Sequence, residues 1–294
     1  MNDKALECCR ALQRAMLWND PMKFSTKFLA SETQAEDMAE MNLACVSVTG
    51  SWNYDLQTEE SDTDLKAAYW PTFEQFYDGK FPHVQLQTVQ CAGGEFDLSL
   101  APVHELLSHV LKGNLGWVEM LYPRHPEYFW STMTQLDYCM DRLRVLAPMN
   151  AKASVLSALG HARKKMAKLH SYTPSTAQYE DRHGYNLKEA CHAVRFVSVA
   201  SHLLEHGELD FVNHDNMETV RDLKFGRLTE DEARSAWVDA EMYLLNLAFF
   251  NGSDKERNWS NRANDLDGYE SDEWNHERAL FEQHLREVVR THLR

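Results

Sequence analysis

Four short strand-like runs lie between residues 43 and 100, whereas the chain after residue 126 has an almost entirely helical pattern. The expected strands are near 43–49, 62–69, 83–90 and 94–100. The last two alternate apolar with polar residues, which is typical of half-buried strands, and the Gly93-Gly94 pair suits the turn between them. This order of elements predicts an α+β fold, with a small mixed or antiparallel sheet followed by a C-terminal all-helical domain.

The boundary between the two parts is expected at 123–126, Pro-Arg-His-Pro, because two prolines in four residues break regular structure. We therefore predict one domain at 1–123 and a helical domain at 124–294. A chain of 294 residues is long enough for two modest domains. Helices are expected at 3–17, 31–42, 102–112, 115–122, 127–145, 150–170, 185–206, 217–225, 230–250 and 271–293. The polar segment 251–270 is expected to be a long exposed loop.

Two aspartates follow the first strand. The run 42–49 stops at Gly50-Ser51, a turn at which the backbone can approach a ligand closely. After a short loop come Asp62 and Asp64, whose side chains leave the same face, about 6–7 Å apart at Cα, if Thr63 is extended. Such carboxylates repel by roughly 4 kcal/mol at an effective dielectric near 20, and so favour a cation between them. Oxygen ligands beside a phosphate-binding turn indicate Mg²⁺ or Mn²⁺ rather than zinc.

A third carboxylate is expected on the last strand. In the run 94–100, Phe96, Leu98 and Leu100 alternate with polar residues, which places Asp97 on the polar face. The sequence therefore predicts that Asp62, Asp64 and Asp97 surround one phosphate-sized space, an arrangement that suits metal-assisted nucleotidyl transfer.

At these residues the sequence resembles the DNA polymerase β-like nucleotidyltransferase superfamily, whose signature is a Gly-Ser turn, an Asp-x-Asp pair and a third acidic residue on a later strand. Further residues look like a poorly characterised bacterial and phage branch, some of whose members are linked to RNA repair. They are Tyr54, Thr58, Ser61, Leu111–Asn114, Glu119–Leu121, Tyr185, Asn186, Lys188, His192, Arg195, Lys224 and Gly226. The resemblance covers roughly 43–245. The chain departs from it at Asp55, where the branch usually has Gly, and at Lys66-Ala67, where Arg-Gly is expected.

The resemblance implies transfer of a nucleoside monophosphate from a nucleoside triphosphate, such as ATP, to an acceptor hydroxyl, with release of pyrophosphate. We hypothesise that Asp62 and Asp64 bind two Mg²⁺ ions, and that Asp97 ligates the catalytic ion and orients or deprotonates the acceptor. Gly50, Ser51 and nearby N–H groups would cradle the phosphates.

Two residues near this site each have two possible interpretations from the sequence. Lys66, just past Asp64, is either a phosphate contact or an ordinary surface lysine. Glu119 is shared with the family branch, but it lies on a short apolar helix and is also interpretable as the partner of a buried cation.

A basic stripe is expected on the helix from Tyr185, because Lys188, His192 and Arg195 recur at i, i+4 and i+7. The helix is apolar on most sides and should be buried, so the stripe must face internal carboxylates or a bound triphosphate. With the acidic residues and the resemblance, we favour the triphosphate: Lys188 and Arg195 would hold its β- and γ-phosphates, and His192 would donate to phosphate or ribose.

The net charge of −15 opposes broad nucleic-acid affinity without excluding RNA in a local basic groove. The basic run 163–168 is either a solvated helix face or a guide for RNA. An RNA end is the acceptor that the resemblance implies. Nucleotidylation of a protein or small molecule, as in AMPylation, is the alternative that the acidity favours. A non-catalytic nucleotide-binding or partner-binding module, and phosphohydrolysis with water as acceptor, are the competing readings.

The remaining composition bounds the cellular setting. No apolar run approaches the ~20 residues that span a bilayer, so no membrane is expected as a partner. The first residues lack a signal-peptide pattern and the six cysteines form no Cys-x-x-Cys pair, which predicts a cytoplasmic protein with reduced thiols.

Overall fold

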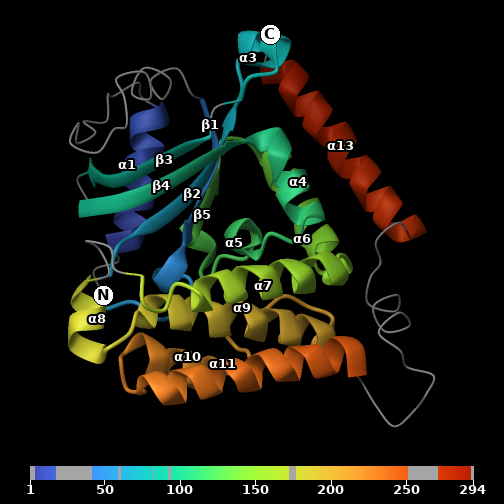
Figure 1. Ribbon diagram of the computed structural model, residues 1–294. Coiled ribbons are helices and arrows are strands. Elements are labelled where there is room, and N and C mark those ends of the chain that lie inside the picture. The colour runs from blue at the N-terminus through green and yellow to red at the C-terminus, as the bar shows by residue number, and fades with distance from the viewer. Residues whose placement is uncertain are drawn as a thin grey trace. The chain divides into compact units, whose positions relative to one another are not determined.

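The computed structural model describes residues 4–17, 42–58, 61–81, 83–91, 94–171, 177–250 and 271–292 (Figure 1). The chain divides into two compact units. The first consists of Met1–His109, Gly116–Arg144 and His276–Arg294, and the second consists of Val110–Leu115 and Val145–Asn275. The α+β expectation is confirmed, since the first unit holds a mixed sheet and the second is helical in its described residues.

The sheet of the first unit has five strands in the order β3-β4-β2-β1-β5. Its strands are β1 (Asn42–Thr49), β2 (Asp64–Trp70), β3 (Val84–Cys91), β4 (Gly94–Pro102) and β5 (Phe129–Ser131). β2 and β4 are parallel, and the other neighbouring strands are antiparallel. Four of these strands match the sequence prediction, whereas β5 was not predicted.

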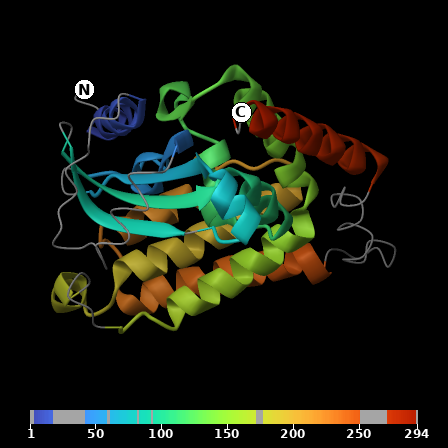
Figure 2. The ribbon, with the colours of Figure 1, turned by 90° about the horizontal axis from the view of Figure 1, so that it is seen from above.

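The two faces of the sheet differ in chemistry. Val48, Leu65 and Leu98 are neighbours on β1, β2 and β4, and they belong to a core that includes Ala5 and Cys8 of α1 (Lys4–Leu17). Figure 2 shows α1 along this side of the sheet. Because side chains alternate between faces, the next row along the strands points to the opposite face. That row is Thr49, Asp64 and Asp97.

Short helices follow these strands, and most of their residues belong to the first unit, although Val110–Leu115 is part of the second. They are η1 (Gly50–Trp52), α3 (Phe73–Asp78), η2 (Val103–Glu105), α4 (Leu106–Leu111), α5 (Leu115–Val118), η3 (Glu119–Leu121) and η4 (Pro126–Tyr128). Two longer helices follow, α6 (Thr134–Met149) and α13 (Asp272–His292). Arg142 of α6 holds Glu277 of α13 in an ion pair of 2.8 Å, which ties the end of the chain to this unit.

The second unit is built around α9 (Leu187–His206), against which α7 (Ala151–Met166), α10 (Met217–Lys224) and α11 (Glu230–Leu245) pack. α9 begins where the side chain of Asn186 accepts a hydrogen bond from the Glu189 N–H, and it ends at Gly207 with φ of 75°. The unit also contains α8 (Ala177–His183) and the π-helix η5 (Asn246–Phe250). The helices predicted at 150–170, 185–206, 217–225 and 230–250 are therefore present.

The chain differs from its predicted organisation after residue 123. β5 pairs with β1 through Cys45 and Ser131, so the segment Gly116–Arg144 packs with the sheet, and the helix expected at 127–145 begins only at Thr134. The expected helix at 31–42, apart from residue 42 in β1, and the loop at 251–270 lie outside the described residues. None of the helices that the structure describes is long and apolar enough to cross a membrane.

Candidate active site

The backbone places Asp64 and Asp97 side by side. Asp64 opens β2 and Asp97 is its register partner on the parallel strand β4, where the Asp97 N–H donates to the Thr63 carbonyl at 2.8 Å. On the other side, Thr49 is the register partner of Asp64, and its hydroxyl donates to the Asp64 carbonyl at 3.3 Å. Two of the three predicted carboxylates are thus fixed to neighbouring positions by strand pairing.

Asp62 lies just before β2. It is exposed, Thr63 is fully buried, and Asp64 is half-buried. This alternation is the one expected of extended chain, in which Asp62 and Asp64 share a face. The exposure pattern is the one that the Asp-x-Asp spacing predicts, and a shared site for Asp62 with Asp64 and Asp97 stays a prediction.

The turn after β1 lies directly against Asp64. Gly50 has φ of 68°, and a Cβ atom at this position would be 2.1 Å from Asp64 Oδ2 and 2.9 Å from its Cγ. The turn continues as η1, in which the Asn53 N–H donates to Gly50 O at 3.0 Å and the Leu56 N–H donates to Ser51 O at 2.9 Å. Only glycine meets both the left-handed backbone and the close approach of the carboxylate.

The donor set suits a hard divalent cation, because carboxylate oxygens are the ligands that Mg²⁺ and Mn²⁺ prefer, and the cradle at Gly50 keeps the Asp64 oxygen at the turn. Across the described part of the chain, however, no three His, Cys, Asp or Glu side chains are grouped as metal ligands. The metal site at Asp62, Asp64 and Asp97 stays a prediction. Strand register supports it for Asp64 and Asp97.

Glu119 lies beneath the turn and is 3% exposed. Its carboxylate accepts a hydrogen bond from Tyr54 OH, from Lys66 Nζ at 2.6 Å, and from the Gly50 N–H at 3.4 Å. Lys66 is therefore paired and largely buried rather than an ordinary surface lysine. Of the two readings of Glu119, the structure shows the partner of a buried cation.

Asp55 has φ of 58°, the left-handed conformation that favours glycine. Its carboxylate forms an ion pair with Arg124. Asp55 is also the position at which the sequence departs from the glycine of the family branch, so here the departure coincides with a glycine-like backbone.

The predicted basic stripe on α9 has a graded exposure. Lys188 is exposed, His192 is half-buried, and Arg195 is 5% exposed. Burial, followed by the charges of Arg195, Lys165, Lys188 and Lys224, holds the pKa of His192 well below its usual range, so this imidazole is neutral at pH 7.

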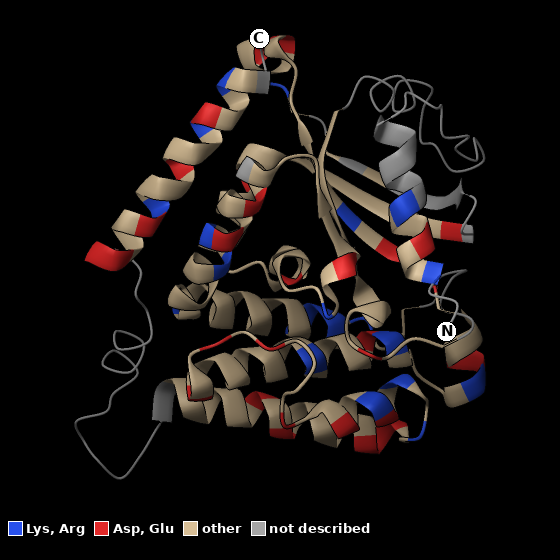
Figure 3. Ribbon diagram, turned by 180° about the vertical axis from the view of Figure 1, so that it is seen from behind, with Lys and Arg blue, Asp and Glu red and all other residues tan. Residues whose placement is uncertain are grey.

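The cations around His192 come from three neighbouring helices of the second unit, α7, α9 and α10 (Figure 3). Glu189 compensates one of them through an ion pair with Lys165 at 3.1 Å. The positive charges of Lys165, Lys188, Arg195 and Lys224 around His192 favour the binding of an anion there. Contact of Lys188, His192 and Arg195 with a triphosphate stays a prediction.

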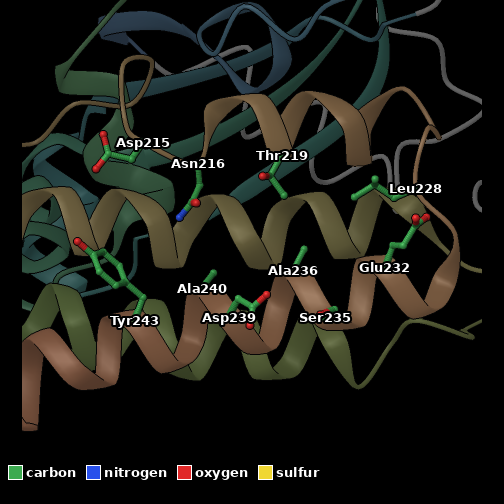
Figure 4. Close-up of a pocket in the computed structure, with 10 residues that line it drawn as sticks. All are labelled: Asp215, Asn216, Thr219, Leu228, Glu232, Ser235, Ala236, Asp239, Ala240 and Tyr243. Carbon is green, nitrogen blue, oxygen red and sulfur yellow. The ribbon is translucent and has the colours of Figure 1, made fainter.

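A pocket of about 590 Å³ lies along α10 and α11 (Figure 4). The residues that line it are Asp215, Asn216, Thr219, Leu228, Glu232, Ser235, Ala236, Asp239, Ala240 and Tyr243. Three of them are acidic and none is Lys or Arg, so the pocket disfavours a triphosphate. The sequence does not reveal it, because its residues come from α10, α11 and the segments just before these helices, and have no distinctive spacing.

No protein-family model matches the chain, and no curated protein matches it. One solved structure that it resembles is a nucleotidyltransferase-like protein from Exiguobacterium sibiricum 255-15. The likeness has 14% identity and a TM-score of 0.27, and covers 80% of this chain and 84% of that chain. At this TM-score the likeness carries no argument about fold or activity.

Proposed function

We propose that the chain is a metal-dependent nucleotidyltransferase that moves a nucleoside monophosphate from a nucleoside triphosphate to the hydroxyl of an RNA end, releasing pyrophosphate. The observation that supports this most is the register of Asp64 with Asp97 beside the Gly50 turn. The sequence motif that resembles the DNA polymerase β-like superfamily consists of these same residues.

In the proposed reaction, the acceptor oxygen forms a bond to the α-phosphorus while the bond from that phosphorus to the bridging oxygen breaks, and pyrophosphate leaves. Asp97 orients the acceptor hydroxyl and takes its proton, which then passes to solvent. Asp62 and Asp64 would hold the metal ion beside the Gly50 turn, where the triphosphate would lie. Bound Mg²⁺ would supply electrostatic stabilisation of the entering and leaving oxygens.

Phosphate contacts in the first unit are assigned to Ser51 and the turn that it shares with Gly50. Lys66 is not assigned a phosphate contact. Its ammonium already forms an ion pair with Glu119, at 2.6 Å from Glu119 Oε1. A phosphate that recruited Lys66 would leave a buried carboxylate without its cation, which is costly.

Nucleotidylation of a protein or small molecule is the second candidate, and the net charge of −15 favours it because an acidic protein repels RNA phosphates. The two acceptors differ in a simple readout. Transfer to RNA labels nucleic acid and has a strongly salt-dependent binding step, whereas transfer to protein labels polypeptide.

The experiment is incubation with each α-³²P-labelled nucleoside triphosphate and Mg²⁺ or Mn²⁺, with RNA pools, lysate proteins and metabolites as acceptors. Asp97→Asn should abolish transfer and largely preserve nucleotide binding, because it removes the proton acceptor and leaves the turn intact. Asp78→Asn is the control, since Asp78 is an exposed acid at the end of α3.

Near-normal transfer by Asp97→Asn would contradict the role of Asp97. Nucleotide binding without any transfer would favour the non-catalytic module, and release of pyrophosphate without a labelled acceptor would favour water as acceptor.

A further inference from the structure

Three donors from separate positions in the chain meet at the carboxylate of Glu119. Gly50 lies at the start of the turn, Tyr54 follows η1, and Lys66 lies within β2, yet all three donate to this one side chain from η3. The Glu119 side chain is 4% exposed and Tyr54 is fully buried. Glu119 therefore connects the turn to the strand that carries Asp64.

The Lys66 ammonium is a potential competitor for the site. Lys66 and Asp64 are two residues apart on β2, so their side chains leave the same face of the sheet. An ammonium on that face would place its positive charge near Asp64 if nothing else held it, and a nearby positive charge opposes binding of a metal cation. The short contact between Lys66 Nζ and Glu119 Oε1 gives this charge another partner.

Burial makes the arrangement sensitive to a single change. The Lys66 side chain is 18% exposed, so loss of the Glu119 charge would leave a largely buried ammonium without its partner, which costs more than the pair contributes when intact. A Gln at 119 has one acceptor oxygen, which cannot serve all three donors in the same way.

We propose that Glu119 is a positioning residue for the site at Asp64: its carboxylate holds the Gly50 turn against β2 and directs the Lys66 ammonium away from Asp64. This rests on the proposed function for its consequence in catalysis. The positions of the Gly50 turn and of the Lys66 ammonium are properties of the protein without substrate. They can therefore be measured without any transfer reaction.

The first measurement is hydrogen exchange of the full chain, followed by mass spectrometry of peptides from the turn and from β4. In Glu119→Gln, the amides of Asn53 and Leu56, which donate within the turn, should exchange at least about tenfold faster, with a much smaller change in β4. Adding Lys66→Met should restore exchange to within about threefold of wild type, because the unpaired ammonium is gone. Glu105→Gln, which alters a more exposed ion pair with His83, is the matched control and should leave the turn unchanged.

The second measurement is Mn²⁺ binding, by electron paramagnetic resonance of the free ion. Glu119→Gln should weaken Mn²⁺ binding about tenfold, since Lys66 turns to Asp64, and Glu119→Gln with Lys66→Met should recover most of it. A purely structural role for Glu119 predicts no such recovery. Wild-type protein that binds no Mn²⁺ would count against the proposed function, whereas hydrogen exchange would still decide the role of Glu119.

Turn amides within about twofold of wild type in folded Glu119→Gln would overturn the proposal, as would an equal acceleration in β4, which reports general loss of stability. If Glu119→Gln does not fold, Tyr54→Phe decides. Tyr54→Phe removes one donor to Glu119 and should accelerate exchange in the turn by about threefold. Unchanged turn exchange in Tyr54→Phe overturns the proposal.

Discussion

Gly50 lies so close to the carboxylate of Asp64 that a Cβ atom at residue 50 would be 2.1 Å from Asp64 Oδ2. Two residues from different segments therefore share one small space, and the turn and the strand cannot shift independently. Asp64 is also the register partner of Asp97 on the neighbouring strand β4. The position of Asp64 thus depends on both the turn and the sheet.

Gly50→Ala tests this contact. The substitution adds left-handed strain of about 1–2 kcal/mol and a clash that costs about 1–3 kcal/mol more, and it should displace Asp64 and abolish transfer. The matched control is Gly79→Ala, because Gly79 has a similar φ of 64° and a Cβ atom there would meet nothing within 4 Å. Urea denaturation should show the larger loss for Gly50→Ala. Equal losses of stability in the two variants would mean that the clash is relieved without cost.

Substitutions at Asp55 test whether the left-handed backbone at this residue is strained. Asp55→Ala and Asp55→Gly both remove the ion pair with Arg124, but only glycine adopts φ of 58° without strain. Asp55→Ala should therefore be less stable than Asp55→Gly by about 1 kcal/mol, measured by chemical denaturation. A smaller loss for alanine than for glycine would show that the backbone relaxes out of this conformation.

His214 predicts a dependence of stability on pH. Burial, and then the charge of Arg195, lower the pKa of this imidazole to about 4 in the folded chain, while an unfolded histidine titrates near 6.5. The unfolded chain therefore takes up the proton first as the pH falls. The contribution of neutral His214 to the free energy of unfolding is therefore complete above pH 6.5. It is lost as the pH falls from about 6.5 to about 4, and the loss is about 3 kcal/mol at most.

The measurement is the free energy of unfolding between pH 4 and pH 8. His214→Gln should flatten the acid side of this profile, whereas His206→Gln, at an exposed position, serves as the control. An unchanged slope in His214→Gln would show that other groups carry the pH dependence.

Lys188 tests the predicted triphosphate contact on α9. Because Lys188 is exposed and near the other cations around His192, Lys188→Ala should raise the Kd of a nucleoside triphosphate by about five- to tenfold at low salt, and by less at high salt. Lys152→Ala removes an exposed lysine of α7 and serves as the control. Isothermal titration calorimetry gives both constants, and equal affinities in the two variants would argue against the contact.

The sequence was informative wherever the structure depends on local pattern. The strand at 43–49 was predicted from its apolar, β-branched run and bounding glycine, and the strand at 94–100 from its alternation, which are local signals. The sequence also predicted that Asp64 and Asp97 share one space, and strand pairing makes them register partners. β5 was missed because it has three residues and its pairing with β1 joins Cys45 to Ser131, which no local period reveals. The short helices α3 and α8 were also missed, although the capping box of Thr72 and Gln75 at the start of α3 is a local signal.

The site was predicted less completely than the fold. The pairing of Lys66 with Glu119 joins residues that are 53 positions apart, so spacing offered two readings for each and could not select one. Asp55 was noted only as a departure from the glycine of the resembled branch, and the structure adds that its backbone is left-handed. Long-range partners require a structure, because no local spacing specifies them.

The helix α13 belongs mainly to the sheet-bearing unit, although the second unit precedes it in the chain. During synthesis, the strands that carry Asp64 and Asp97 leave the ribosome first, but Glu277 reaches Arg142 only after all of the intervening helices have been made. The first unit therefore stays incompletely packed until the intervening helices and α13 have been translated. A translation arrest before α13 would trap a nascent chain whose sheet-bearing unit lacks its last helix.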